Sequence, residues 1–286
     1  MNKNNKLLIF TLLLVIALSA LNAEYIISTT KSKIIQSSVE DSFGEAPLGT
    51  YPLILLHGYN PIYSRRIAEI SLKDMQSELS DDLGYVNKGI LTSETTCSEL
   101  HYSKDPIVIR ATYLNKLEID EIDEYTNNVA KIISKVKECT GAEKVDLITH
   151  SMGGIVVRNY IEHNDSSSIR KFIMLGTPNH GGLYNLGEFA DYFVEEGESK
   201  INLDFIMLSE NHNFMKSLND GDETSGNVEY YTIAGNIDGK GDGLVLSKSV
   251  SLDGEDNHLE VSCNHLQLKY PSSCLESYDF IKKVLS

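Results

Sequence analysis

The stretch "DLITHSMGGIVVRNY" (residues 146–160) decides the fold. An apolar run ends at His150, and after Ser151 two glycines lead directly into a second apolar run. This order predicts a buried strand, a tight turn at the serine and then a helix. A turn that exposes a single side chain needs small residues two positions before and after it. Here these positions hold Thr149 and Gly153, so threonine stands where glycine would be the simplest choice.

Strand-like and helix-like segments alternate on both sides of this turn. Apolar runs predict strands at residues 51–58, 106–114, 144–149, 170–177, 228–235 and 258–263. Helical spacing predicts helices at residues 68–84, 119–139, 153–163 and 273–285. Such alternation is typical of the α/β class, with a mostly parallel central sheet flanked by helices. The polar segment 95–105 is predicted to be a loop, and Ser273 with Glu276 has the spacing of a capping box.

The N-terminal 23 residues predict a secretory signal peptide. Two lysines precede the apolar run "LLIFTLLLVIALSAL", and small Ala23 offers a cleavage point. A retained signal anchor is the alternative, although the run is short for a membrane span. We therefore expect the mature domain at residues 24–286. Residues 183–227 are long for a connection and are expected to form a cap or lid, with ordinary surface helices as the alternative.

Four cysteines behind a signal peptide predict two disulfides and an oxidising compartment, outside the cell or within the secretory or lysosomal pathway. Of the three pairings, we favour Cys97–Cys139 and Cys263–Cys274, because the second closes a short loop. Asn164 begins an Asn-Asp-Ser glycosylation sequon. No CxxC motif or His/Cys cluster suggests zinc, so we predict no metal site and no cofactor.

The charge balance limits the partners. The formal net charge is −16, and removing the signal peptide would remove two lysines and no acid. Such a chain is not expected to bind nucleic acid or to dock electrostatically on anionic lipid. Transient contact with a lipid surface through apolar residues stays open, and so does the oligomeric state.

The turn at Ser151 lies where a parallel sheet binds ligands, beyond the carboxyl ends of its strands. A serine hydroxyl there can attack a carbonyl if a base takes its proton and donors bind the oxyanion. The expected donors are backbone N–H groups, one from Met152 after the serine and one from Tyr59 after "HG".

The acid and the base are expected later in the chain. Asp238 and Asp242 both lie in glycine-rich turns, and we favour Asp242 as the acid because Asp238 fits turn chemistry better. His258 and His265 are the candidate bases, and we favour His265, which lies in a loop before the last helix. The other histidines are interpreted as structural, packing or surface residues: His57, His101, His163, His180 and His212.

These blocks together resemble the α/β-hydrolase superfamily, and within it the secreted lipases of the bacterial triacylglycerol-lipase type and their eukaryotic relatives. The resemblance rests on "LILLHGYN", "LITHSMGGIVVRNYI", "MLGTPNHGG", "GDGLV" and "CNHLQL", and it covers about residues 51–286. It implies that Ser151 is the nucleophile, Asp242 the acid and His265 the base, with the two backbone donors named above.

Two positions depart from the pattern. Thr149 replaces the usual first glycine of the turn, a position where some lipases have alanine or threonine. Gln267 stands where several calcium-binding relatives have an aspartate, which argues against a calcium site. Glycosylphosphatidylinositol inositol-deacylases and lecithin–cholesterol acyltransferases share parts of the pattern, so the motifs do not fix the substrate.

The leading hypothesis is a secreted serine esterase or lipase that cleaves carboxylic esters, most of all those of lipids, through an acyl-enzyme. The alternative is a thioesterase or a deacylase of phospholipid or glycosylphosphatidylinositol-type substrates. A third hypothesis is a non-catalytic member of the fold that binds lipid or protein. The apolar residues of the insert, among them Tyr184, would line an acyl groove or pack in a core.

Overall fold

The structure is a computed structural model, and it describes residues 50–59, 70–101, 105–114, 122–184 and 210–286. Two units divide the chain, Met1–Gly44 and Glu45–Ser286, and every described residue belongs to the second. The predicted signal peptide lies outside the described residues, and so does the greater part of the predicted cap.

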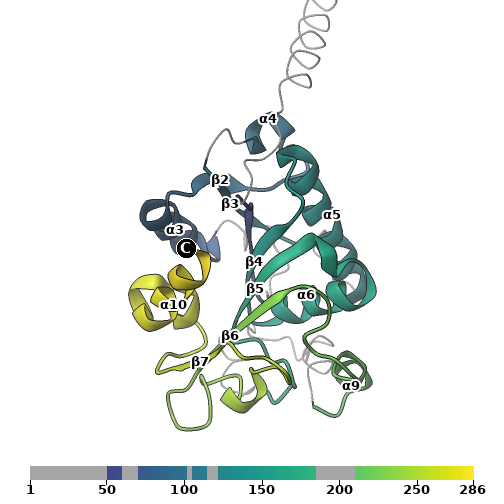
Figure 1. Cartoon of the computed structure of the whole chain (residues 1–286). Helices are drawn as coiled ribbons and strands as arrows, with labels where there is room; N and C mark the ends of the chain where they lie inside the picture. Colours follow the sequence, from purple (N-terminus) through teal and green to yellow (C-terminus); the bar gives the residue numbers. More distant parts are fainter. Residues whose placement is uncertain (1–49, 60–69, 102–104, 115–121, 185–209) are drawn as a thin grey trace, which may run out of the picture. The chain divides into compact units, whose positions relative to one another are not determined.

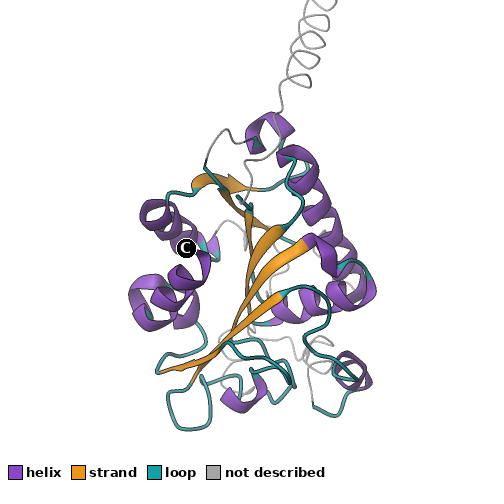
Figure 2. Ribbon diagram, viewed as in Figure 1, coloured by secondary structure: helices purple, strands orange, loops and turns teal. Residues whose placement is uncertain are grey.

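Seven parallel strands form one sheet in the described part of the chain, in the order β2-β3-β1-β4-β5-β6-β7 (Figures 1 and 2). The strands are β1 Leu53–Leu56, β2 Val86–Ile90, β3 Ile107–Ala111, β4 Val145–His150, β5 Ile169–Leu175, β6 Glu229–Gly235 and β7 His258–Val261. The central strands are near-continuous apolar runs because both faces of a parallel sheet are buried. The expected α/β architecture is confirmed.

Helices cover both faces of the sheet (Figure 1). Side chains of α5 and α6 pack in one apolar cluster and those of α3 and α10 in another, with the sheet between the two clusters. The helices are α3 Lys73–Leu83, α4 Cys97–Leu100, α5 Ile122–Thr140, α6 Met152–His163, α9 Asn213–Leu218 and α10 Leu275–Leu285. None of the described helices is long and apolar enough to cross a membrane.

Three local features differ from the sequence prediction. Residues 86–90 form the edge strand β2, whose sequence "VNKGI" has no clear alternation and pairs with β3 alone. The predicted loop at 95–105 contains the one-turn helix α4, because Glu99 Oε2 accepts a hydrogen bond from the Thr96 N–H at 2.6 Å. The predicted capping box is wrong, since Ser273 ends a 3₁₀ turn and Cys274 caps α10.

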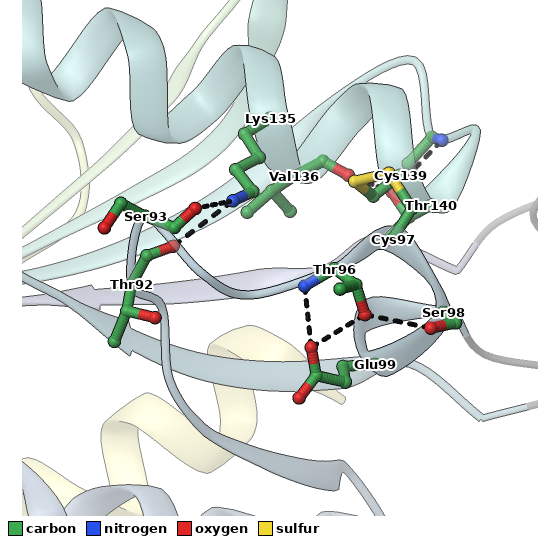
Figure 3. Close-up of a disulfide and its surroundings, with 11 residues drawn as sticks. Thr92, Ser93, Thr96, Cys97, Ser98, Glu99, Lys135, Val136, Cys139 and Thr140 are labelled. Atoms are coloured by element: carbon green, nitrogen blue, oxygen red, sulfur yellow. Dashed lines mark hydrogen bonds between the residues drawn. A yellow bond between two sulfur atoms is a disulfide. The ribbon is translucent and has the colours of Figure 1, made fainter. Parts of the chain in front are cut away.

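Both favoured disulfides form. Cys97–Cys139 joins α4 to the end of α5, and Lys135 of α5 donates to the carbonyls of Thr92 and Ser93 in the preceding loop (Figure 3). Cys263–Cys274 closes the short loop before α10. The first bond therefore fixes a peripheral helix, and the second encloses the loop that holds His265.

Candidate active site

Ser151 occupies a strained turn between β4 and α6. Its φ is 54° and its ψ is −130°, a backbone conformation that residues other than glycine rarely adopt. The Ser151 N–H donates to the Leu175 carbonyl of β5 at 2.8 Å, which fixes the turn to the neighbouring strand. The serine thus stands at the carboxyl edge of the sheet, where α/β folds bind ligands.

Glycines let other backbone segments approach this turn. A Cβ on Gly58 would lie 2.8 Å from the Ser151 Cβ, and one on Gly153 would lie 2.3 Å from the His57 carbonyl oxygen. A Cβ on Gly154 would lie 2.2 Å from Thr177 Oγ1. These separations are too short for a carbon atom, which explains why both positions after Met152 are glycine.

The turn accommodates Thr149 two positions before the serine, where glycine would be the simplest choice. It lies in β4 between Leu56 of β1 and Met174 of β5, and its side chain is fully buried. Its hydroxyl has no hydrogen-bond partner among the described residues. The fold therefore tolerates the extra atoms, but it leaves one buried polar group unsatisfied.

The structure brings Asp242 and His265 together. Their side chains join through Asp242 Oδ2 and His265 Nδ1 at 2.7 Å, and the His265 N–H donates to the Asp242 carbonyl at 2.9 Å. The other carboxylate oxygen accepts from the N–H groups of Leu244 and Val245. An acceptor-only carboxylate requires Nδ1 of His265 to carry the proton, which leaves Nε2 as the basic nitrogen.

The other candidates serve different purposes. Asp238 is exposed, and its carboxylate accepts from the N–H groups of Lys240 and Gly241, as a turn residue does. His258 opens β7, where its Nδ1 lies 2.7 Å from the Thr232 hydroxyl. Asp242 hydrogen-bonds to neither of them.

His57 and Tyr113 orient the peptide that follows β1. The Gly58 carbonyl accepts from His57 Nδ1 at 2.7 Å and from the Tyr113 hydroxyl at 3.3 Å, and the two rings stack. Because a trans peptide is planar, the Tyr59 N–H points away from the carbonyl that these two side chains hold. The prediction of a structural histidine at position 57 is confirmed, and Tyr113 is a contributor that sequence reasoning missed.

The protonation state of His57 follows from its partners. A carbonyl only accepts, so Nδ1 carries the proton, and Nε2 accepts from the Thr112 hydroxyl at 2.7 Å. Burial lowers the pKa of His57 to about 4. The side chain is therefore neutral at physiological pH.

His150 connects the turn to the loop of His265, a contact that sequence reasoning also missed. Its Nε2 donates to the His265 carbonyl at 2.8 Å, and the two rings lie 4.7 Å apart. Burial lowers the pKa of His150, which keeps a second positive charge away from His265. The residue next to the serine thus helps to place the histidine.

Loop contacts around His265 involve Gln267. Its side-chain oxygen accepts from the Asn264 N–H at 2.8 Å, and Asn264 Oδ1 in turn accepts from the Gln267 N–H at 2.9 Å. The Gln267 side chain therefore braces the backbone of its own loop.

The two expected oxyanion donors belong to residues next to the serine, one along the chain and one in space. Met152 is the first residue of α6, so its N–H has no acceptor within the helix. Tyr59 follows Gly58, whose Cα lies against Ser151. Asn164, the predicted glycosylation site, caps the exposed end of α6.

Comparison with known proteins identifies the family of the chain. The family model for palmitoyl protein thioesterase matches residues 52–231, more than half of the chain. The chain belongs to the palmitoyl protein thioesterase family. No curated protein matches the sequence significantly.

Solved structures show the fold of this family member. The mature lipase BlEst2 of Bacillus licheniformis superposes with a TM-score of 0.56 at 19% identity, covering 85% of this chain and 94% of that one. The product of gene lin2722 of Listeria innocua superposes with a TM-score of 0.53 at 20% identity, covering 82% and 94%. The chain therefore has the α/β-hydrolase fold of lipases and esterases, within a hydrolase family.

The family match includes Ser151 but ends before Asp242 and His265. The grouping of Asp242 with His265 therefore depends on the hydrogen bond between their side chains and not on the family model.

Proposed function

We propose that the protein is a serine hydrolase of lipid acyl esters, with Ser151 as nucleophile, His265 as general base and Asp242 as orienting acid. The observation that carries the proposal is the buried 2.7 Å hydrogen bond from His265 Nδ1 to Asp242 Oδ2 beside a strained serine turn. Strain at a turn that presents one hydroxyl is characteristic of nucleophilic serines in this fold.

The mechanism follows from the tautomer of His265. Its unprotonated Nε2 takes the Ser151 hydroxyl proton while Oγ attacks the acyl carbonyl. The Asp242 carboxylate stabilises the imidazolium that results, and the N–H groups of Leu244 and Val245 hold that carboxylate in place. His265 then gives the proton to the leaving group, and a water molecule releases the acid from Ser151 by the same steps in reverse.

The oxyanion is bound by two backbone donors in this proposal. The Met152 N–H lies at the positive end of α6, which favours negative charge. The Tyr59 N–H is the second donor, oriented through the Gly58 carbonyl that His57 and Tyr113 hold.

A thioester is the second candidate substrate, and the family match favours it. The same residues act on both bond types, because the attacked atom is an acyl carbonyl in each. Lipid contact would be transient and apolar, as the chain is strongly acidic. Two disulfides support a secreted or lumenal location.

Labelling with a fluorophosphonate probe tests the nucleophile. Wild type should be labelled and Ser151→Ala should not. Ser249→Ala is the matched control, because Ser249 is also buried but lies in another loop. Equal labelling of wild type and Ser151→Ala would remove the nucleophile assignment.

A paired panel of oxyesters and thioesters with the same acyl chain then defines the substrate. Turnover of thioesters alone would replace the lipase interpretation with the thioesterase one. Binding of fatty acid with no labelling and no turnover would favour a non-catalytic member of the fold.

A further inference from the structure

We propose that His180, Glu223 and Asp253 form a binding site for a divalent transition-metal ion, with zinc the best fit. One nitrogen and two carboxylate oxygens of these side chains all lie within 4.8 Å of one another. No residue of the proposed catalytic machinery belongs to this group. The site is therefore independent of the proposed function.

The three residues come from separate segments that meet in space. His180 follows β5, Glu223 follows α9, and Asp253 lies between β6 and β7. His180 closely precedes the long segment predicted as a cap, Glu223 lies near the end of that segment, and Asp253 lies in the segment that follows Asp242. A metal ion there would join segments that are otherwise linked by hydrogen bonds.

Glu223 is the fixed part of the site. Its side chain is 4% exposed, its Oε1 lies 2.9 Å from His180 Nε2, and its Oε2 accepts from the Asp253 N–H at 2.9 Å. A buried carboxylate is destabilising unless it has such partners. The guanidinium of Arg158, itself buried, is close enough to favour the ionised form.

His180 is also held in place. Its backbone N–H donates to the Ser249 carbonyl at 3.0 Å, so the ring approaches Glu223 from an anchored segment. The ring is one-third exposed, and the Asp253 side chain is exposed with no hydrogen-bond donor among the described residues. Asp253 can therefore turn toward an ion without breaking an existing contact.

The ligand set selects the metal. Zinc binds imidazole nitrogen and carboxylate oxygen at about 2.0–2.2 Å, so tetrahedral ligands lie about 3.3 Å apart. The 2.9 Å separation of His180 and Glu223 needs to open by only a few tenths of an ångström. Calcium and magnesium prefer oxygen ligands throughout, so the nitrogen argues against them. The exposed side of the site leaves a fourth position for water.

Charge supports binding of a cation. Two carboxylates face one imidazole, and Asp220 and Asp222 line the neighbouring hollow. The positive charge of Arg158 opposes the binding of a cation. However, the Arg158 guanidinium donates its hydrogen bonds to the carbonyls of Asn179 and Leu218, which are not among the three ligands. Zinc would neutralise the two acidic ligands, which the proton on His180 does only in part.

The test is zinc titration of the full-length chain after treatment with a chelator, by competition with a chromophoric chelator and by thermal unfolding. We expect one zinc ion per chain and a higher melting temperature with zinc, while calcium and magnesium at the same concentration leave it unchanged. His180→Gln keeps a donor for Glu223 but removes the imidazole, and Asp253→Asn changes an exposed side chain. Each should weaken zinc binding by at least about tenfold.

Asp256→Asn is the matched control, an exposed acid nearby with the same change in charge. It should bind zinc as wild type does. Equal loss in Asp256→Asn and Asp253→Asn would overturn the proposal in favour of general attraction by the acidic surface. So would the absence of zinc binding by wild type, or equal stabilisation by calcium. Fluorophosphonate labelling of Ser151 is read separately, so failure of one proposal is distinguishable from failure of the other.

Discussion

The neutral, buried state of His57 predicts how the protein loses stability in acid. The pKa of His57 is lowered by burial from 6.5 to about 4. Between these two values the unfolded chain binds a proton that the folded chain excludes. The contribution of His57 to the free energy of unfolding is therefore fully present above about pH 6.5. It decreases as the pH falls towards 4, and it changes no further below that pH.

The size of the effect follows from the shift. A difference of about 2.5 pKa units, at about 1.36 kcal/mol for each unit, corresponds to about 3 kcal/mol. Such a loss is a substantial part of the roughly 5–15 kcal/mol that stabilises a typical domain. Urea unfolding at pH 7.5 and pH 4.5, with the disulfides intact, measures it as a change in the free energy of unfolding.

His57→Asn is the appropriate perturbation. An asparagine amide can still donate to the Gly58 carbonyl, but it does not titrate. The variant should be less stable than wild type at pH 7.5, because the bond to Thr112 is lost. It should lose about 2–3 kcal/mol less than wild type between the two pH values.

A matched control is His163→Asn, which replaces an exposed histidine. It shows whether the loss of any imidazole flattens the pH dependence. Parallel curves for wild type and His57→Asn would refute the reasoning, because His57 would then titrate alike in the folded and unfolded chains.

Three further predictions concern the serine turn and the pair beside it. Asp242→Asn should lower kcat by about 10⁴-fold, because an amide can hold His265 in the wrong tautomer. Urea unfolding should show that the variant is folded. Retained activity would exclude Asp242 as the orienting acid. Thr149→Val removes a buried unpaired hydroxyl at constant shape and should stabilise the fold by about 1 kcal/mol in urea unfolding; a loss of stability would reveal a partner for that hydroxyl. Gly176→Ala places a Cβ 3.0 Å from Asp242 Oδ2 at a φ of +56°, and it should lower kcat and destabilise the fold by about 1–3 kcal/mol. Gly84→Ala, at φ +74° with no atom within 4 Å, should show the backbone strain alone and keep wild-type kcat.

Local sequence patterns were sufficient for the central fold. The strands on either side of β4 are apolar runs of the right length, and α5 shows regular burial at three-to-four spacing. The pairing of Asp242 with His265 was favoured over Asp238 and His258 from chain order and loop setting. Both favoured disulfides also form, and the Cys263–Cys274 pairing could be predicted because these two cysteines enclose a short loop.

Tertiary contacts decided what the sequence could not show. β2 gains its strand conformation from its neighbour β3, since "VNKGI" itself has no strong strand pattern. Cys274 caps α10 because the disulfide and the 3₁₀ turn at Pro271 fix the backbone before it. His180 was interpreted as a surface or packing residue, because its partners Glu223 and Asp253 are distant in sequence.

The order of the site residues along the chain has a consequence for synthesis. Ser151 and the turn that strains it are made first, while Asp242 and His265 come with β6, β7 and the loop before α10. A growing chain that has just emerged therefore carries the serine without the imidazole that would take its proton. On the proposed mechanism, hydrolysis begins after the last strands have joined the sheet, so the nascent chain cannot attack acyl lipids before its fold is complete.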